Sequence, residues 1–391
     1  MIIRREIEPV FHSLLGQYPI VTITGPRQSG KSTFVKTTLP QKAYVNLEDI
    51  EHRGFADTDP KGFLRQFPEG VILDEFQRAP NLLSHIQVLV DERHQNGMFV
   101  LTGSQQLKIS ETISQSLAGR TGILKLLPLT MKESLLFEEH VDWEKFIYTG
   151  FYPRIFEQKL NPNQMLGDYF ETYVERDLRQ LTQVRQLSVF QKFVRLCAGR
   201  IGQLLNMNSL ANDVGVSHTT IKEWISVLEA SHIIYLLQPL HANLSKRLTK
   251  SPKLYFTDVG LASYLLGFEN SRQVFTHPLK GSLFENLVIM EAMKHRLNQG
   301  KRANFFFYRD SSGHEVDLVI ESADGLILIE IKAGETFSSS YLDGLSYFKK
   351  ISKAPLLHSI VVYGGLEERE HLETKITAVF AFADLLERIQ A

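Results

Sequence analysis

The sequence is poor in cysteine and in long apolar runs, and each absence excludes a class of protein. Cys197 is the only cysteine among 391 residues, which excludes disulfides within the chain and zinc sites built from several thiolates. No stretch approaches the roughly 18 apolar residues of a membrane span, and the opening segment MIIRREIEPVF lacks the apolar core of a signal peptide. We therefore expect a reduced, cytoplasmic protein with no membrane partner.

The sequence also has no large excess of positive or negative charge. The 43 basic and 44 acidic residues give a formal net charge of −1. Any surface that binds nucleic acid must therefore be local rather than a property of the whole chain. The chain is too long for one ordinary core, and we expect an α/β protein with domains at residues 1–150, 151–270 and 271–391.

The segment GPRQSGKST, residues 25–33, fits the phosphate-loop pattern G-x-x-x-x-G-K-[ST] in full. The apolar run YPIVTITG before it predicts a buried strand, and KSTFVKTTL after it can start a helix. Gly25 and Gly30 allow the backbone to curl around phosphate. Lys31 is expected to reach the β and γ phosphates of ATP, and the Ser32 hydroxyl to ligate Mg²⁺. The predicted nucleotide-binding residues are Gly25, Pro26, Arg27, Gln28, Ser29, Gly30, Lys31, Ser32, Thr33 and Ser104.

A second motif, GVILDEFQRAP at residues 70–80, supplies two carboxylates. Its apolar run predicts a strand buried on both faces of a parallel sheet, and Asp74 emerges at the carboxyl end, where α/β proteins bind ligands. Asp74 can hold Mg²⁺, and Glu75 can polarise the attacking water. The alternative is that both are ordinary acids that cap the next element.

A third strand is predicted at MFVLTGSQQ, which ends in polar residues. Ser104 is the candidate there for sensing the γ-phosphate, although a simple turn explains it equally well. Arg120, in SLAGRTGILKLLPLT, follows a glycine and precedes a strand-like run. It is the candidate arginine finger, acting on the nucleotide of a neighbouring subunit. The alternative is a surface arginine, or one that caps the sheet.

In this order, TGPRQSGKST, VILDEFQRAP, LTGSQQ and SLAGR resemble the motifs of a bacterial and archaeal family of AAA-type ATPases. The resemblance covers nearly the whole chain. It implies ATP rather than GTP as the nucleotide, and a C-terminal domain of unknown function with a nuclease-like fold. It leaves the biological role open.

The middle of the chain carries a helix-turn-helix pattern in NSLANDVGVSHTTIKEWISVLEASHII. Apolar residues mark a short helix and then one face of a second, with Gly215 at the turn and Ser217 as the cap. The following segment, IIYLLQPLHANLSKRLTKSPKLYFTD, can form the two strands of a wing. DNA contact is the functional interpretation, and a winged-helix spacer that serves packing is the alternative. The predicted DNA contacts are Lys222, Lys246, Arg247, Lys250 and Lys253.

The C-terminal part begins with GSLFENLVIMEAMKHRL, which we expect to form an amphipathic helix carrying Glu285. The next segment predicts three strands, with Asp317 in EVDLVI and with Glu330 and Lys332 on one face of LILIEIKAG. Glu285, Asp317 and Glu330 can bind a divalent metal, and Lys332 can orient a water. This order resembles the PD-(D/E)XK nuclease (restriction-endonuclease-like) fold. A paired structural network of the same residues is the alternative to a cleaving site.

Three functional hypotheses follow from these motifs. The first is an Mg²⁺-dependent ATPase that remodels or processes DNA, branched or single-stranded forms included, as a homo-oligomer such as a hexameric ring. The second is a regulatory or defence switch in which ATP controls assembly with a protein partner. The third is a metal-dependent nuclease gated by the ATPase.

Overall fold

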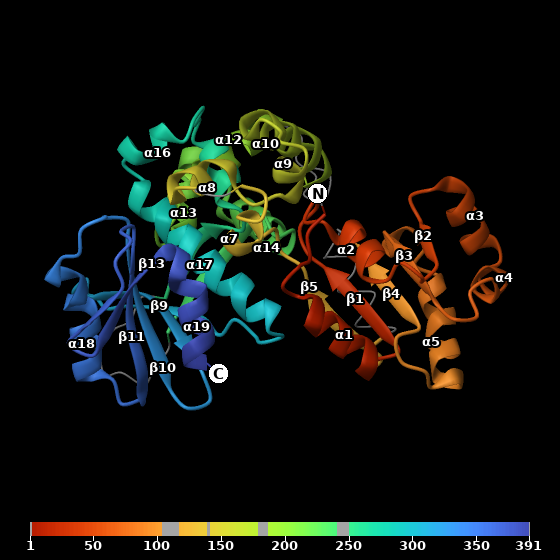
Figure 1. The fold of residues 1–391 in the computed structure, drawn as a ribbon. Coiled ribbons are helices and arrows are strands. Elements are labelled where there is room, and N and C mark those ends of the chain that lie inside the picture. Colours follow the sequence, from red (N-terminus) through yellow and green to blue (C-terminus); the bar gives the residue numbers. More distant parts are fainter. Residues whose placement is uncertain (1, 104–116, 139–140, 179–186, 241–249, 391) are drawn as a thin grey trace. The chain divides into compact units, whose positions relative to one another are not determined.

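The computed structural model describes residues 2–103, 117–138, 141–178, 187–240 and 250–390. These residues form two compact units (Figure 1). Unit 1 consists of Met1–Leu129, Ala230–His232 and Leu297–Lys301, and unit 2 of Thr130–Glu229, Ile233–Arg296 and Arg302–Ala391. No helix in the described ranges is long and apolar enough to cross a membrane.

A parallel sheet forms the centre of unit 1, with the strand order β2-β3-β4-β1-β5 within its described part (Figure 1). All its strands point the same way, so the segments that follow β1, β3 and β4 leave the sheet at one edge. The strands predicted around the phosphate loop and before Asp74 are confirmed as β1 and β3. The strands are β1 (Ile20–Thr24), β2 (Tyr44–Asn46), β3 (Val71–Asp74), β4 (Phe99–Thr102) and β5 (Thr121–Lys125).

Helices cover both faces of this sheet, which explains why its strands are apolar on both sides. In β3, Val71 and Leu73 pack into the core on the side of α3, α4 and α5. Ile72 between them packs into the opposite core with residues of α1 and α2. The elements are α1 (Glu8–Gln17), α2 (Lys31–Thr38), α3 (Ile50–Thr58), α4 (Pro60–Arg65), η1 (Phe76–Arg78) and α5 (Leu82–Arg93).

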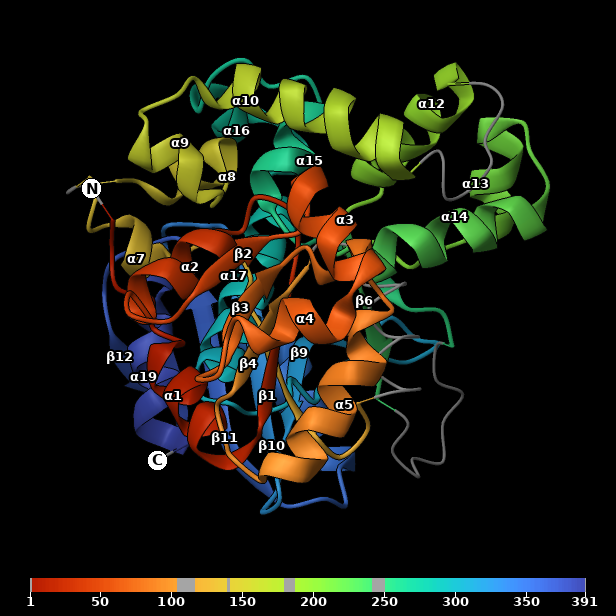
Figure 2. The same cartoon turned by 90° about the vertical axis from the view of Figure 1, so that its right-hand side faces the viewer.

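Unit 2 begins with a helical region, and it contains the predicted pair of helices α13 and α14. Gly215 stands between them with a left-handed φ of 88°, and the Ser217 hydroxyl accepts a hydrogen bond from the Thr220 amide at 3.1 Å. Trp224 of α14 packs edge-on against Phe190 and Phe193 of α12, and Figure 2 shows these helices grouped together. The helices are α7 (Met131–Ser134), α8 (Trp143–Thr149), α9 (Pro153–Glu157), α10 (Pro162–Tyr169), η2 (Phe170–Leu178), α12 (Leu187–Ala198), α13 (Met207–Val214), α14 (His218–Ala230), α15 (Val259–Leu265) and α16 (Arg272–Thr276).

The second sheet, also in unit 2, has the order β12-β13-β11-β10-β9-β8-β6-β7 in the described residues. The two predicted wing strands, β6 and β7, are antiparallel to each other, and β6 also pairs with β8. One sheet therefore spans the predicted domain boundary at residues 270 and 271. The elements are β6 (Ile234–Pro239), β7 (Lys253–Phe256), β8 (Phe305–Arg309), β9 (Glu315–Glu321), β10 (Leu326–Lys332), η3 (Ser339–Leu342), α18 (Asp343–Ile351), β11 (Leu356–Tyr363), β12 (Arg369–His371), β13 (Thr374–Ala378), η4 (Val379–Ala381) and α19 (Phe382–Gln390).

Helix α17 (Lys280–Asn298) corrects one expectation, because it is not amphipathic. Its buried residues run continuously from Asn286 to Lys294 and so cover every side of the helix. Two of them are charged: Lys294 pairs with Glu291 at 2.6 Å, and Glu291 also accepts a hydrogen bond from the Met131 amide at 2.8 Å. These polar contacts allow α17 to be buried all round, which a pattern of apolar residues does not reveal.

Candidate active site

The phosphate loop leaves β1 in a conformation that requires glycine at two places. Gly25 has a φ of 144°, and a Cβ added to it would lie 2.1 Å from the Leu126 carbonyl oxygen. Gly30 has a φ of 90° and caps the start of α2. At Gly25 the backbone therefore lies too close to its neighbour for a side chain, and at Gly30 it adopts a left-handed conformation that favours glycine.

Replacement Gly25→Ala is therefore expected to disrupt the loop and weaken ATP binding by at least about tenfold, or ~1.4 kcal/mol. Titration with a fluorescent ATP analogue measures this. Gly16→Ala is the matched control, because Gly16 lies in helix α1 with no atom within 4 Å of an added Cβ. Equal affinity in the two variants would show that the loop tolerates a different backbone conformation.

Lys31 lies inside the loop, with 6% of its surface exposed. Its Nζ donates to the carbonyl oxygens of Gly25 at 3.1 Å and Pro26 at 2.8 Å. Burial lowers the pKa of Lys31 to about 8, although the charges of Glu75 and Asp74 act to raise it. The Ser29 hydroxyl is fully buried and, in the described structure, has no hydrogen-bond partner. A buried cation and an unsatisfied hydroxyl in a glycine-bounded loop suit an anionic ligand such as phosphate.

Asp74 lies at the carboxyl end of β3, in register with Thr102 at the end of β4. It is 5% exposed and accepts hydrogen bonds from the Tyr44 hydroxyl, at 2.5 Å, and from the Thr102 hydroxyl. Burial first and Asp74 second raise the pKa of Tyr44, while an interaction with the Ser32 side chain lowers it. The two predicted Mg²⁺ ligands are Asp74 and Ser32, which follows Lys31 at the start of α2. A hydroxyl and a carboxylate are hard oxygen donors, so this set fits Mg²⁺.

Glu75 follows directly, in a left-handed backbone conformation with a φ of 55°. This conformation is uncommon for a residue other than glycine and is often found at functional sites. It turns the chain sharply from β3 into η1. The Glu75 carboxylate accepts a hydrogen bond from the Gln77 side chain and is only half-buried. Glu75, the base predicted from the sequence, thus has a different hydrogen-bond partner from those of Asp74.

Arg120 makes a two-pronged ion pair with Asp91 of its own chain. Nε lies 2.6 Å from one carboxylate oxygen and Nη2 lies 2.7 Å from the other. Both side chains are partly exposed. This contact corresponds to the alternative of a surface arginine, and the arginine-finger role stays a prediction. Ser104, the predicted γ-phosphate sensor, lies outside the described residues.

Two further residues of unit 1 were not selected from the sequence. Arg5 is 8% exposed and donates to the carbonyl oxygens of Ser29, at 3.2 Å, and Leu127, at 2.8 Å, which supports the phosphate loop from behind. His232 is buried, and its Nε2 has no partner in the part of the chain that is described. Burial, followed by the charges of Lys125 and Lys31, holds the pKa of His232 well below its usual value. Neither residue belongs to a motif, and nothing local in the sequence marks them.

The acid and lysine residues predicted in unit 2 do come together. Lys332 Nζ lies 2.5 Å from Glu330, as expected for residues two apart on one strand, and 3.2 Å from Asp317 on β9. The Ile331 amide also donates to Asp317, at 2.9 Å. Burial and the neighbouring Asp317 raise the pKa of Glu330 to about 8, despite the opposing effect of Lys332.

Lys253 belongs to this cluster, which corrects its predicted role as a DNA contact. It is 2% exposed, and its Nζ lies 2.8 Å from Glu285 and 3.9 Å from Asp317, and in contact with Glu315. A side chain enclosed in this way is not available to DNA. We call Lys253, Glu285, Glu315, Asp317, Glu330 and Lys332 the acid–lysine centre. Across the described ranges, no group of three or more His, Cys, Asp or Glu residues is arranged to hold a metal ion.

The other predicted DNA contacts divide into two groups. Lys222 on α14 and Lys250 just before β7 are exposed to solvent. Lys246 and Arg247 lie outside the described residues. Two of the five predicted DNA contacts are thus solvent-exposed residues.

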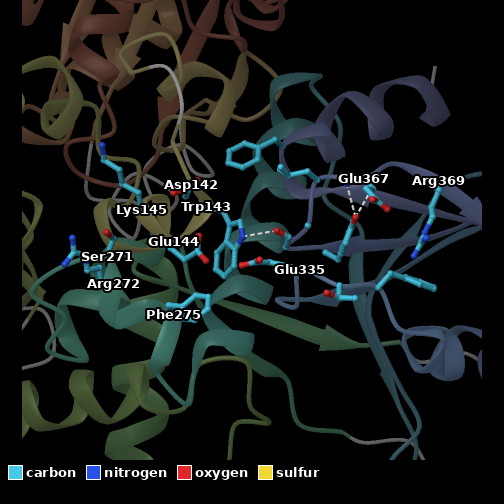
Figure 3. Close-up of a pocket in the computed structure, with 17 residues that line it drawn as sticks. Asp142, Trp143, Glu144, Lys145, Ser271, Arg272, Phe275, Glu335, Glu367 and Arg369 are labelled. Atoms are coloured by element: carbon cyan, nitrogen blue, oxygen red, sulfur yellow. Dashed lines mark hydrogen bonds between the residues drawn. The ribbon is translucent and has the colours of Figure 1, made fainter.

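Unit 2 also contains a cavity of about 920 Å³ that the motifs did not indicate (Figure 3). Its walls include aromatic rings, and the Trp143 indole donates to the Gly364 carbonyl oxygen at 3.2 Å. Four acidic residues, Glu367 among them, and three basic residues line it, so its charge does not favour a polyanion. None of the predicted site residues lines it. The charged lining residues include Asp142, Glu144, Glu335, Lys145, Arg272 and Arg369.

Comparisons with known proteins divide the chain into three matched regions. Residues 17–135 match a family described as "AAA domain". Residues 140–272 match "Domain of unknown function (DUF8612)", and residues 280–382 match "Domain of unknown function (DUF4143)".

Similar whole proteins also exist. An uncharacterized protein of Mycobacterium tuberculosis is 28% identical over 384 residues, which cover 97% of this chain and 84% of that protein. An uncharacterized protein of Haemophilus influenzae is 22% identical over 380 residues, covering 86% and 88%. Among solved structures, a Walker-type ATPase of Pyrococcus abyssi is 14% identical with a TM-score of 0.43, covering 68% of this chain and 96% of that chain. The phosphate loop and Asp74 both lie in residues 17–135, so the match to the AAA family supports an ATPase of the P-loop, AAA type in this part of the chain.

Proposed function

We propose that this chain hydrolyses ATP with Mg²⁺, using Lys31, Ser32, Asp74 and Glu75. The observation that carries the proposal is the placement of Asp74 between the Tyr44 and Thr102 hydroxyls, together with the buried Lys31 in the phosphate loop. The loop amides and Lys31 bind the phosphates, and the cation supplies further charge neutralisation.

Each residue has one task in this scheme. Lys31 leaves the carbonyl oxygens of Gly25 and Pro26 and donates to the terminal phosphate, where negative charge develops. Asp74 is held in its orientation by the two hydroxyl donors. Glu75 orients the attacking water and accepts its proton.

Phosphate release measured with the wild-type protein tests the proposal. We expect turnover in the presence of Mg²⁺ and a loss of at least about 100-fold when EDTA removes the metal, because the charge on the phosphates is then not neutralised. Turnover that continues unchanged in EDTA would contradict the assignment of Ser32 and Asp74 as metal ligands.

DNA is the second part of the proposal, supported by the helix pair α13 and α14, the strands β6 and β7, and the exposed Lys222 and Lys250. In this view ATP turnover drives remodelling or processing of DNA by a homo-oligomer. A switch that acts on a protein partner is the competing function. Stimulation of turnover by single-stranded, duplex or branched DNA separates the two, because only the first requires it.

The double variant Lys222→Ala/Lys250→Ala is expected to weaken DNA binding and to reduce the slope of log affinity against log salt by about 2, roughly 0.9 for each lost phosphate contact on duplex DNA. Fluorescence anisotropy at several salt concentrations measures both quantities. Lys350→Ala on α18 is the control, since Lys350 is exposed and lies outside the predicted contacts. An unchanged slope in the double variant would remove these two lysines from any DNA surface.

A further inference from the structure

In the acid–lysine centre, the carboxylates are paired with lysine ammonium groups from two different strands. Its carboxylates come from α17, β9 and β10, and lysines enter from two separate strands, β7 and β10. Lys332 stands at the edge of the centre, with its side chain 35% exposed, and pairs with Asp317 and Glu330. Lys253 is different, because its side chain is 3% exposed and its ammonium faces carboxylates of α17 and β9 together.

The geometry points to Lys253 as a built-in cation that takes the place of a divalent metal ion in this centre. Its Nζ contacts Glu285 at 2.8 Å and Glu315 directly, with Asp317 at 3.9 Å. Glu285 and Asp317 are two of the carboxylates that the sequence marks as metal ligands. The position from which a metal would reach both oxygens is therefore held by an ammonium group of the chain itself.

Neighbouring contacts keep this ammonium in place. The Tyr255 hydroxyl, two residues along the same strand, donates to the same Glu285 oxygen at 2.5 Å. Arg309 on β8 holds the second oxygen of Glu315 at 3.0 Å. Glu285 and Glu315 are thus oriented from both sides toward Lys253.

The carboxylates of the centre already have cationic partners. Lys253 lies against Glu285 and Glu315, Lys332 against Asp317 and Glu330, and Arg309 against Glu315. Glu330 is buried beside them, and its Oε2 has no hydrogen-bond partner in the described structure. A divalent ion would place two more positive charges beside the enclosed ammonium of Lys253, which is unfavourable unless that lysine leaves.

This centre is consequently closed to divalent metal ions, and metal-dependent cleavage of DNA by it is excluded while Lys253 remains paired. The inference is independent of the proposed ATP hydrolysis, because every residue that carries it belongs to unit 2. It leaves open whether the chain binds DNA elsewhere.

Mn²⁺ binding by the full-length protein without nucleotide tests the inference, with electron paramagnetic resonance reporting free Mn²⁺. Wild-type protein is expected to show no site that depends on Asp317. Lys253→Met removes the ammonium and keeps an unbranched apolar side chain. It is expected to bind Mn²⁺ at least about tenfold more tightly than the wild type. Adding Asp317→Asn to Lys253→Met is expected to abolish that gain.

Two further variants make the result specific. Lys253→Arg keeps the positive charge and is expected to bind no Mn²⁺ at the centre. Lys294→Met removes another buried lysine, paired with Glu291, and is expected to create no Mn²⁺ site. If Lys253→Met is poorly folded, Mn²⁺ is still expected to raise its thermal midpoint, since a ligand stabilises the state that binds it.

Two outcomes would overturn the inference. One is Mn²⁺ binding to the wild type that Asp317→Asn removes, because the centre would then accept a metal beside Lys253. The other is a Lys253→Met protein that neither binds Mn²⁺ nor is stabilised by it, because the lysine would then not occupy the position of a cation.

Discussion

Replacement Glu75→Gln is expected to leave ATP affinity within about threefold of the wild-type value and to reduce turnover by at least about 100-fold. The amide has the size of the carboxylate but cannot accept a proton from the attacking water, and a positioned general base contributes about 100- to 10,000-fold to a rate. Equilibrium titration with an ATP analogue and single-turnover phosphate release measure the two quantities separately.

The structure explains why Glu75, rather than Asp74, is selected for this test. Both oxygens of Asp74 already accept hydrogen bonds, from Tyr44 and Thr102, so its carboxylate is fixed in orientation, as suits a metal ligand. Glu75 leaves the strand in a left-handed conformation and is half-buried, with Gln77 as a neighbour. Its side chain is therefore partly exposed to solvent.

Lys31→Ala provides the contrast, because it removes a group that contacts phosphate in the ground state. We expect this variant to lose ATP affinity itself, whereas Glu75→Gln retains it. Glu48→Gln is the matched control, since Glu48 is an exposed carboxylate paired only loosely with Arg78, at 3.8 Å. Wild-type turnover by Glu75→Gln would show that another group serves as the base.

The features predicted correctly from sequence are those with a local cause. The phosphate loop, β1 and β3 combine glycines at fixed spacing with short apolar runs, and the pattern is complete within a few residues. The same holds for Glu330 and Lys332, because side chains two positions apart on a strand lie on the same face of the sheet. Asp317 was selected with them from its own strand, β9, and the predicted hairpin brings it into the site.

Lys253 shows why other features were missed. In the segment SKRLTKSPK it looks like one more exposed basic residue, and no nearby residue distinguishes it from Lys250. The difference is made by Glu285 and Glu315, which lie on α17 and β9, far along the chain. Tertiary pairing of this kind leaves no periodic signal. Arg5, Tyr44 and the all-round burial of α17 escaped prediction for the same reason.

The largest effect on stability is expected for Lys253→Met, which should lower the free energy of unfolding of unit 2 by about 3–5 kcal/mol at pH 8 in the absence of divalent metal. Removing one partner of a buried ion pair leaves the other charges uncompensated, and that cost commonly reaches this size. Tryptophan fluorescence during urea unfolding is a suitable measurement, because the chain has two tryptophans and both, Trp143 and Trp224, lie in unit 2. Lys250→Met, three residues away and exposed, is the control and should change little.

The loss of unfolding free energy in Lys253→Met is expected to depend on pH, whereas the loss from a simple packing defect would not. Burial raises the pKa of Glu285 and the charge of Lys253 opposes this rise, so Glu285 takes up a proton more readily in Lys253→Met than in the wild type. The deficit of Lys253→Met is therefore expected to be smaller at pH 5 than at pH 8. A deficit that is equal at both pH values would indicate that Lys253 contributes packing rather than charge.

Glu330 supplies an independent check on the same centre. Burial, followed by Asp317, raises the pKa of Glu330 from its ordinary value to about 8, so the folded state binds a proton that the unfolded state releases. Stability from this group is fully present below the unfolded pKa, near 4.3, and is lost as the pH rises through about 8. Glu330→Gln carries no such proton, so its unfolding free energy should fall less than that of the wild type between pH 5 and pH 9. Parallel curves for the two proteins would show that Glu330 is ionised throughout.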